Sequence, residues 1–199
     1  ALEHLIRDGR IQPGRIEDVV KKYQNEIDQE IMKAGEEAIF KLGIGRIDRE
    51  IVKLIGTLKY RYSYGQNALQ HSMEVAYIAG CMAAELGLNQ QIAKRAGLLH
   101  DIGKALNIEQ HDGSHVELGY KFCKKHGEKE IVLNAIHSHH GDVEPKFLTS
   151  HLVIAADTIS AARPGARKES AQAYINRLEN LEKIANGFEG VSNAFAIQA

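Results

Sequence analysis

The chain of 199 residues has few cysteines and prolines and no long hydrophobic run. It has two cysteines, three prolines, three methionines and no tryptophan. Cys81 and Cys123 stand alone, without a CxxC pair, which argues against a disulfide framework or a thiolate zinc site and favours two buried thiols in a reducing compartment. No apolar run approaches the roughly 18 residues that span a bilayer, and no signal-like leader opens the chain.

The chain also lacks an excess of charge of either sign. It carries 25 Lys and Arg against 26 Asp and Glu, so a uniformly basic surface for nucleic acid is excluded and any anion must be bound by a local patch. A hydrophobic content of 44% excludes disorder as the dominant state. Histidine, in contrast, is concentrated: nine of the ten lie between His71 and His151. Such clustering is the first indication of metal chemistry.

Apolar residues recur with helical spacing almost throughout, and the alternation typical of strands is nearly absent. A stripe from Ile16 to Ala38 predicts one long amphipathic helix between Pro13 and Gly43, suited to packing on the chain's own core or on a partner helix. Further helices are expected near 51–58, 67–86, from 89 to the His100 region, from 114, and over 129–139, 146–162 and 167–186. The sequence therefore predicts an all-α helical bundle.

Two regions are expected within this all-α fold. Residues 1–45 form a helical lead-in, and residues 46–199 form the domain that carries the chemistry, with its site between 71 and 157. Residues 193–199 resemble the start of a strand that stops at once, so we expect the chain to be a piece of a longer protein.

The adjacent pair His100-Asp101, at the end of an apolar helix, is the strongest chemical signal. It places a nitrogen ligand beside an oxygen ligand, the mixed set that suits a catalytic divalent metal ion. His71 and Asp157 are expected to complete this set. Asp157 follows the apolar run 152–156, where a buried carboxylate needs a cation or hydrogen bonds.

Three more histidines, His115, His139 and His140, bring the candidate ligands to seven. One metal ion seldom takes so many, so the set indicates two ions bridged by Asp101. The other histidines are interpreted as surface or hydrogen-bonded residues: His4, His111, His126, His137 and His151. For His137 there is an added reason, because two helix positions before His139 it faces away from the site.

These residues carry a resemblance to a known family. His71, His100-Asp101 and Asp157 match the H…HD…D pattern of the HD superfamily of metal-dependent phosphohydrolases. Four longer stretches are similar to the bacterial ribonuclease Y family: 58–67 (LKYRYSYGQN), 113–117 (GSHVE), 138–142 (SHHGD) and 160–167 (SAARPGAR). The resemblance covers essentially the whole chain, with residues 2–10 similar to the end of the KH domain that precedes the HD domain.

The resemblance implies a metal-dependent endoribonuclease that cuts single-stranded RNA and initiates mRNA decay. A metal-activated hydroxide would attack phosphorus in line and leave a 5′-monophosphate, with Asp101 bridging the ions and Lys104 neutralising phosphate charge. Two Mn²⁺ or Mg²⁺ ions are expected, with Zn²⁺ or iron as alternatives. The resemblance also implies a homodimer, RNA-decay scaffold partners, and a full-length protein anchored at the cytoplasmic face of the cell membrane, of which this piece is cytoplasmic.

The expected substrate-binding residues are Arg163, Arg167, Lys168, Arg61 and Asn67. The first three follow Asp157 and open a predicted helix, an arrangement that suits phosphate. Arg61 is interleaved with Lys59, Tyr62 and Tyr64, a mixture that suits single-stranded RNA but is equally consistent with tyrosines packed in the core. Asn67 stands four residues before His71, where related two-metal enzymes often have an acid, and is expected to be a weaker ligand or a neighbour of the ligands.

Two other functions remain open. One is an HD phosphohydrolase acting on a small nucleotide or cyclic dinucleotide. Guanosine tetraphosphate hydrolases of this superfamily carry acids shortly after the His-Asp pair, whereas 102–104 reads IGK, and HD-GYP enzymes carry Gly-Tyr-Pro where 141–145 reads GDVEP. The other is a non-catalytic dimerisation or scaffold domain, against which the complete ligand set argues.

Overall fold

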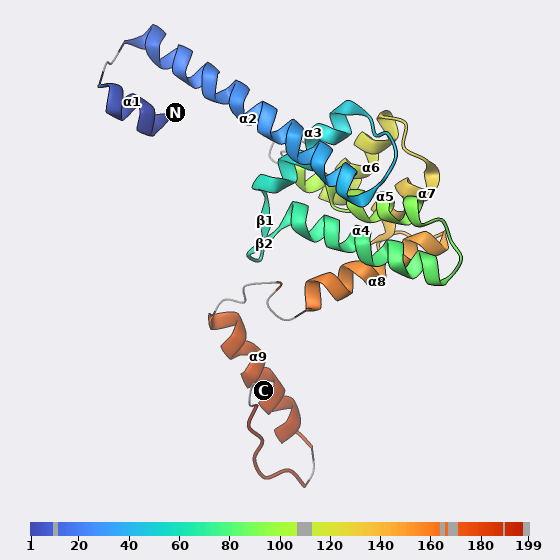
Figure 1. Cartoon of the computed structure of the whole chain (residues 1–199). Coiled ribbons are helices and arrows are strands. Elements are labelled where there is room, and N and C mark those ends of the chain that lie inside the picture. Colours follow the sequence, from blue (N-terminus) through green and yellow to red (C-terminus); the bar gives the residue numbers. More distant parts are fainter. Residues whose placement is uncertain (10–11, 107–112, 164–165, 167–170, 189, 197–199) are drawn as a thin grey trace.

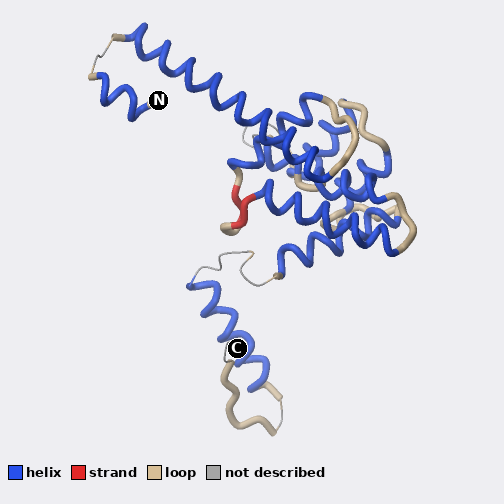
Figure 2. The backbone as a smooth tube through the Cα atoms, in the orientation of Figure 1, coloured by secondary structure: helices blue, strands red, loops and turns tan. Residues whose placement is uncertain are grey.

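The computed structural model describes residues 1–9, 12–106, 113–163, 166, 171–188 and 190–196, with the backbone alone over 171–177. Within these residues the structure is almost entirely helical (Figures 1 and 2), which confirms the predicted all-α fold. Its helices are α1 (Leu2–Asp8), α2 (Pro13–Leu42), α3 (Arg49–Thr57), α4 (Ala68–Glu85), α5 (Gln90–Leu99), α6 (His115–Lys125), α7 (Glu130–Ser138), α8 (Leu148–Ala162) and α9 (Ala171–Asn186). Two short 3₁₀ turns, η1 (Leu58–Tyr60) and η2 (Ile102–Ala105), connect them.

Helix boundaries follow from local chemistry. Pro13 is the first residue of α2, and Gly43 ends that helix in the left-handed conformation, as the sequence predicts. Four helices begin at a residue whose side chain accepts a hydrogen bond from a backbone N–H of the first turn. These residues are Asp48, Asn67, Asn89 and Ser114.

Helix α4 lies at the centre of the bundle, against α5 and α8. Its buried face is built of small side chains, including Ala76 and Ala79, which lets α5 approach closely. A Cβ on Gly97 of α5 would lie 2.7 Å from the Cα of Ala76, so this crossing requires glycine. The crossing brings the end of α5, with His100, next to His71 on α4.

A second close approach places α6. A Cβ on Gly103 of η2 would lie 1.8 Å from the backbone oxygen of His115, so glycine alone lets η2 lie against the start of α6. Since Asp101 immediately precedes η2, this contact brings His115 to the His-Asp pair.

A two-stranded hairpin, which the helical pattern did not predict, precedes α4. Strand β1 (Tyr62–Ser63) pairs antiparallel with β2 (Gln66–Asn67). The turn residues Tyr64 and Gly65 both have positive φ, 51° and 77°, as in the two-residue turns that match strand twist. Tyrosine is an uncommon residue at such an angle.

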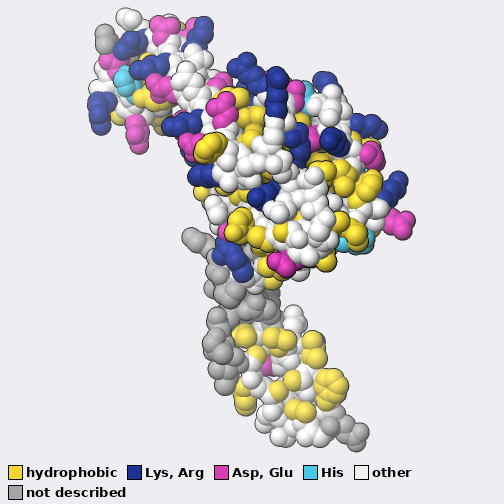
Figure 3. Space-filling model, turned by 45° about the vertical axis from the view of Figure 1, so that its right-hand side comes forward, with side chains coloured by type: hydrophobic (Ala, Val, Ile, Leu, Met, Phe, Trp, Pro, Cys, Tyr) yellow, Lys and Arg dark blue, Asp and Glu magenta, His cyan; other side chains and the backbone are white. Residues whose placement is uncertain are grey.

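The two ends of the chain extend away from the bundle. The second half of α2 packs on α3, while its first half projects outward and α1 folds back beside it (Figure 1). On the opposite side, α9 lies apart from the bundle, and Figure 3 shows hydrophobic side chains gathered on this C-terminal part. Leu181, Ile184 and Phe188 are among its exposed residues.

The predicted strand at 193–199 is wrong for the part that the structure describes. Residues 193–196 are irregular, held by a hydrogen bond from the Ala196 backbone N–H to Glu182, and 197–199 lie outside the described residues. No helix in the described ranges is long and apolar enough to cross a membrane, as the sequence predicts.

Candidate metal centre

All seven predicted ligands converge at one place in the bundle. Two groups share Asp101, and within each group the ligand atoms lie within 4.8 Å of one another. One group is His71, His100 and Asp101; the other is Asp101, His115, His139 and His140. Asp157 of α8 joins the first group, since its Oδ1 lies 3.0 Å from His71 Nε2 and 3.9 Å from His100 Nε2.

The two carboxylate oxygens of Asp101 face different histidines. Oδ2 lies 3.4 Å from His100 Nε2 and 3.9 Å from His71 Nε2. Oδ1 lies 3.4 Å from His115 Nε2 and 3.6 Å from His139 Nε2. A carboxylate placed with one oxygen toward each of two ligand groups is arranged to bridge two cations.

Buried polar atoms without a partner mark the same point. His100 Nε2, His139 Nε2 and Asp101 Oδ1 are buried and make no hydrogen bond. Each such atom costs free energy on the order of 1–3 kcal/mol unless something satisfies it. Three of them in one cluster of nitrogen and oxygen donors fit a divalent cation.

Outer hydrogen bonds orient the two most buried imidazoles. His100 Nδ1 lies 2.7 Å from the backbone oxygen of Gly97, and His139 Nδ1 lies 2.7 Å from that of Ile136. A carbonyl oxygen only accepts, so both Nδ1 atoms carry the proton and both Nε2 lone pairs point into the cluster. This is the tautomer that a metal ligand needs.

His71 is oriented by a longer chain of contacts. Its Nδ1 lies 3.0 Å from Ser160 Oγ, and that hydroxyl donates to Glu74 Oε2 at 2.9 Å. Glu74 in turn receives two hydrogen bonds from the guanidinium of Arg163, at 2.6 and 3.1 Å. Because the Ser160 proton is given to Glu74, Ser160 accepts from His71 and leaves Nε2 free to bind metal.

Most pKa shifts at the cluster agree with a cation site; the exception is His100, where burial would lower the pKa but Asp101 and Asp157 together with the Gly97 backbone raise it. Burial alone would raise the pKa of Asp101, but the surrounding imidazoles, His100 first, outweigh it and hold that pKa well below its usual range. Burial lowers the pKa of His139 and of His140, which favours the neutral, metal-binding form. Burial would raise the pKa of Asp157 too, but the hydrogen bond with His71 and the charges of His100 and His71 together outweigh burial and lower that pKa.

The small cavity at this cluster has a volume of about 30 Å³. Lys104 lines it together with the ligands, and its ammonium contacts Asp101 Oδ2. Ser63 and Gln66 of the hairpin form the opposite wall. The position of Lys104 is that of a cation directed at the site.

The predicted substrate-binding residues differ in their surroundings. Asn67 caps α4 and donates to the Lys59 backbone oxygen at 2.7 Å, so its side chain takes part in the local fold, and its expected role at the site stays a prediction. Arg163 is 46% exposed but already paired with Glu74. Arg61 is exposed beside β1. Arg167 and Lys168 lie outside the described residues.

Sequence reasoning missed Ser160 as an orienting group and Glu74 altogether. The pair Glu74–Arg163 joins residues 89 positions apart, so no local pattern reveals it. The one available signal is the position of Glu74 on α4, three residues after His71, where the side chain can reach the same side of the helix.

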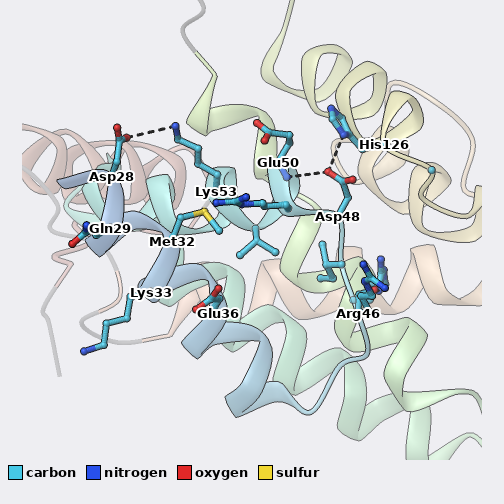
Figure 4. A pocket seen from close by; sticks show the side chains of 15 residues that line it. Asp28, Gln29, Met32, Lys33, Glu36, Arg46, Asp48, Glu50, Lys53 and His126 are labelled. Carbon is cyan, nitrogen blue, oxygen red and sulfur yellow. Dashed lines mark hydrogen bonds and ion pairs between the residues drawn. The ribbon is translucent and has the colours of Figure 1, made fainter. Parts of the chain in front are cut away.

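A larger hollow lies elsewhere, between α2, α3 and the loop that joins them (Figure 4). Its volume is about 1070 Å³, and it contains none of the predicted ligands. Two pairs of its side chains lie close together: Asp28 lies 3.5 Å from Lys53, and Asp48 lies 2.9 Å from His126. We name it the α2–α3 hollow.

Comparison with known proteins matches this geometry. The family model of the HD domain fits residues 68–162, from the start of α4 to the end of α8. Residues 68–162 therefore match an HD domain. The match spans both His71 and Asp157, which confirms the superfamily that the H…HD…D pattern resembles.

The chain is also similar over its whole length to curated ribonucleases Y. It is 56% identical to that of Staphylococcus epidermidis strain RP62A and 57% identical to those of Thermoanaerobacter pseudethanolicus and Enterococcus faecalis. Each alignment covers 100% of this chain but 38–39% of the relative, so the chain spans about two-fifths of their length. A solved structure described as a predicted HD superfamily hydrolase, from an uncultured Thermotogales bacterium, has a TM-score of 0.46 and 22% identity over 68% of this chain and 90% of that one.

Proposed function

We propose that this chain is the catalytic part of a metal-dependent endoribonuclease that cuts single-stranded RNA and takes part in mRNA decay. One observation carries the proposal: Asp101 directs each carboxylate oxygen at a separate group of histidines, with three buried donor atoms unsatisfied. The similarity to proteins named ribonuclease Y supports RNA as the substrate.

The residues divide into two sets of ligands around Asp101. His71, His100 and Asp157 would hold one divalent cation, and His115, His139 and His140 the other. Divalent cations at such a site, when bound, make water more acidic and neutralise charge on a phosphodiester. Mn²⁺ or Mg²⁺ is expected, with Zn²⁺ or iron as alternatives for this donor set.

The exposure of the side chains supports one side of the cluster as the side from which a substrate arrives. The side chains of His100 and His139 are 0% exposed, and they form the closed floor. Asp157, His115 and Lys104 are 19%, 23% and 28% exposed and form the open rim. A phosphodiester that enters over this rim meets Lys104, whose ammonium neutralises charge on a phosphate oxygen.

Hydrolysis at this site needs no 2′-hydroxyl, so a monophosphate rather than a cyclic phosphate is the expected product, and the resemblance to the ribonuclease Y family implies that it stands on the 5′ end. Preference for RNA must then come from contacts outside the ligand cluster. We also propose that residues 1–45 form a helical lead-in and residues 46–199 the catalytic domain. The same proposal includes a homodimer, RNA-decay scaffold partners and attachment of the full-length protein to the membrane.

The test is cleavage of a 5′-labelled single-stranded RNA with Mn²⁺ or Mg²⁺, by the chain and by Asp101→Ala. We expect internal cuts with 5′-monophosphate ends, and a loss on the order of a thousandfold or more in the variant, since removing a group that acts as part of a catalytic unit has that effect. Asp28→Asn, in the α2–α3 hollow, is the matched control and should keep full activity.

A panel of nucleotides tested beside the RNA separates the alternatives. Hydrolysis of a nucleotide or cyclic dinucleotide without RNA cleavage would replace the proposal with a small-substrate phosphohydrolase. Equal RNA cleavage by the chain and Asp101→Ala would assign the activity to a contaminant. Metal binding without hydrolysis of any substrate would favour a non-catalytic domain.

A further inference from the structure

Two adjoining hollows lie along the outer side of α4, away from the metal cavity. Their volumes are about 670 and 430 Å³, and they share Lys41, Gln70 and Met73 in their linings. One reaches the hairpin and the other reaches Arg163 at the end of α8. Together they form a groove between α2 and α4, which we name the α4 groove.

The hairpin is a thin wall between the α4 groove and the metal cavity. Neighbouring residues of a strand point to opposite faces. Ser63 and Gln66, which pair across the hairpin, line the metal cavity, whereas Tyr62 and Asn67, which also pair, line the groove. Gln66 donates to the Ser160 backbone oxygen at 3.5 Å, which ties this wall to α8.

Aromatic rings are displayed along the groove. Tyr62 is 70% exposed, Tyr77 is 63% exposed and Tyr60 is 47% exposed, so none of them is a core residue. Tyr77 lies one helical turn after Met73, which puts both on one side of α4. The Tyr60 hydroxyl donates to Glu30 at 2.8 Å, which holds that ring in place. Exposed rings of this kind are surfaces on which bases stack.

The charge along the groove favours an anion. Lys41 in the groove and Arg61 beside it have no acidic partner among the described residues. The acids nearby are already matched, since Glu37 lies 4.0 Å from Lys33 and Glu74 is held by Arg163. In the α2–α3 hollow, two of the lining acids, Asp28 and Asp48, lie beside Lys53 and His126.

We propose that the α4 groove binds the segment of single-stranded RNA next to the cut phosphodiester, a proposal that rests on the proposed function. Tyr62 and Tyr77 stack bases, and Lys41 and Arg61 contact the backbone. The strand crosses the turn of the hairpin to pass from the groove to the metal centre. The combination of unpaired cations and exposed rings, one strand's thickness from the metal cavity, is what single-strand binding requires.

The test measures affinity for a fluorescent uridine oligonucleotide by anisotropy, with all variants made in the Asp101→Ala chain so that nothing is cut. Tyr62→Ala and Tyr77→Ala should each weaken binding by about tenfold, the effect of losing one stacking platform. Tyr62→Phe, which keeps the ring, should bind as the parent does. Phe188→Ala removes an exposed aromatic residue far along the chain and is the matched control.

Charge is tested through the salt dependence of the same binding. Lys41→Gln should reduce the slope of log affinity against log salt by about 0.7, the value for one phosphate contact on a single strand. Lys125→Gln, an exposed lysine of α6, should leave the slope unchanged. Unchanged affinity in both tyrosine-to-alanine variants, or equal losses in Tyr62→Phe and Tyr62→Ala, would overturn the proposal, and the former would point to a protein ligand for the groove.

The active chain separates this proposal from the proposed function. Tyr62→Ala and Tyr77→Ala should lose cleavage of longer RNA by a much larger factor than hydrolysis of bis(p-nitrophenyl) phosphate, which is too small to reach the groove. A parent chain that hydrolyses neither substrate with metal would contradict the proposed function. A parent that cuts RNA, with variants that cut it equally well, would contradict the groove alone.

Discussion

The metal cavity and the α2–α3 hollow differ in a way that size does not reveal. The hollow has a volume of about 1070 Å³ and the cavity about 30 Å³. In the hollow, the exposed pair Asp28 and Lys53 satisfies itself, and water reaches both groups. In the cavity, Asp101 is almost fully buried and one of its oxygens has no hydrogen-bond partner.

The difference teaches that a functional site is marked by polar groups the fold leaves unsatisfied. Natural proteins pair nearly all buried polar atoms, so three unpaired polar atoms in one cluster cost free energy of folding that the packing of the bundle must offset. Hydrogen bonds from the Nδ1 atoms of His100 and His139 to backbone oxygens direct the Nε2 atoms of both rings into the cluster. In the hollow, the exposed pair Asp28 and Lys53 is a surface pair, which contributes little to stability.

The largest expected effect concerns cations and thermal stability. Mn²⁺ at a hundred times its dissociation constant should stabilise the chain by about 2.7 kcal/mol, because it binds only the folded state. Asp101→Ala should lose this stabilisation, since both ligand groups share that residue. Thermal melts with and without metal measure the shift, and Asp28→Asn should retain it. A metal-induced shift of equal size in Asp101→Ala would show that the ions bind elsewhere.

A second prediction divides the cluster into its two halves. His139→Ala should bind one ion for each two bound by the parent, because His71, His100 and Asp157 remain on the other side of Asp101. Metal content measured after gel filtration gives the ratio, and RNA cleavage should fall at least a hundredfold, as expected when one ion of a two-metal site is lost. His137→Ala, whose ring stacks on Tyr120 outside the cluster, is the control. An unchanged metal content in His139→Ala would contradict a two-ion site.

A third prediction concerns the outer contacts of His71. Ser160→Ala removes the hydroxyl that fixes the Nδ1 proton and should weaken metal binding by about 10- to 100-fold, the usual effect of losing such a partner. Ser160→Thr keeps the hydroxyl and should restore most of the affinity, whereas a merely structural role would not distinguish the two. Titration with Mn²⁺ followed by calorimetry measures both constants. Equal affinities in the alanine and threonine variants would refute the role.

The contrast also explains how far the sequence alone reached. The cluster was predictable because His100-Asp101 is a local pair and Asp157 interrupts an apolar helix. The role of Asn67 is not fixed by its position alone, because a residue that fits a ligand pattern also fits a helix cap, and here Asn67 accepts from the backbone N–H of Gln70.

What the sequence did not predict depends on distance along the chain or on an unusual turn. Ser160 and Glu74 meet across 86 positions, so their contact follows from the packing of α8 on α4. The hairpin was not predicted because its strands have two residues each and its turn has Tyr64 at a position where asparagine is usual. Arg163, which the sequence predicts to bind phosphate, forms an ion pair with Glu74 that the sequence did not predict.

The smallest expected effect compares one ion pair from each region. The Arg163 and Ser160 hydrogen bonds outweigh burial and lower the pKa of Glu74, so the carboxylate stabilises the fold above its unfolded pKa and loses that contribution as pH falls through the folded value. Glu74→Gln should therefore destabilise the chain by about 1 kcal/mol or less at pH 7, with the difference disappearing in acid. Asp28→Asn should change stability by less than about 0.5 kcal/mol at either pH, because its pair with Lys53 is exposed. Urea unfolding at pH 7 and at pH 3 measures both, and equal effects of the two substitutions would remove the distinction between a pair that supports a metal ligand and one that merely lines a hollow.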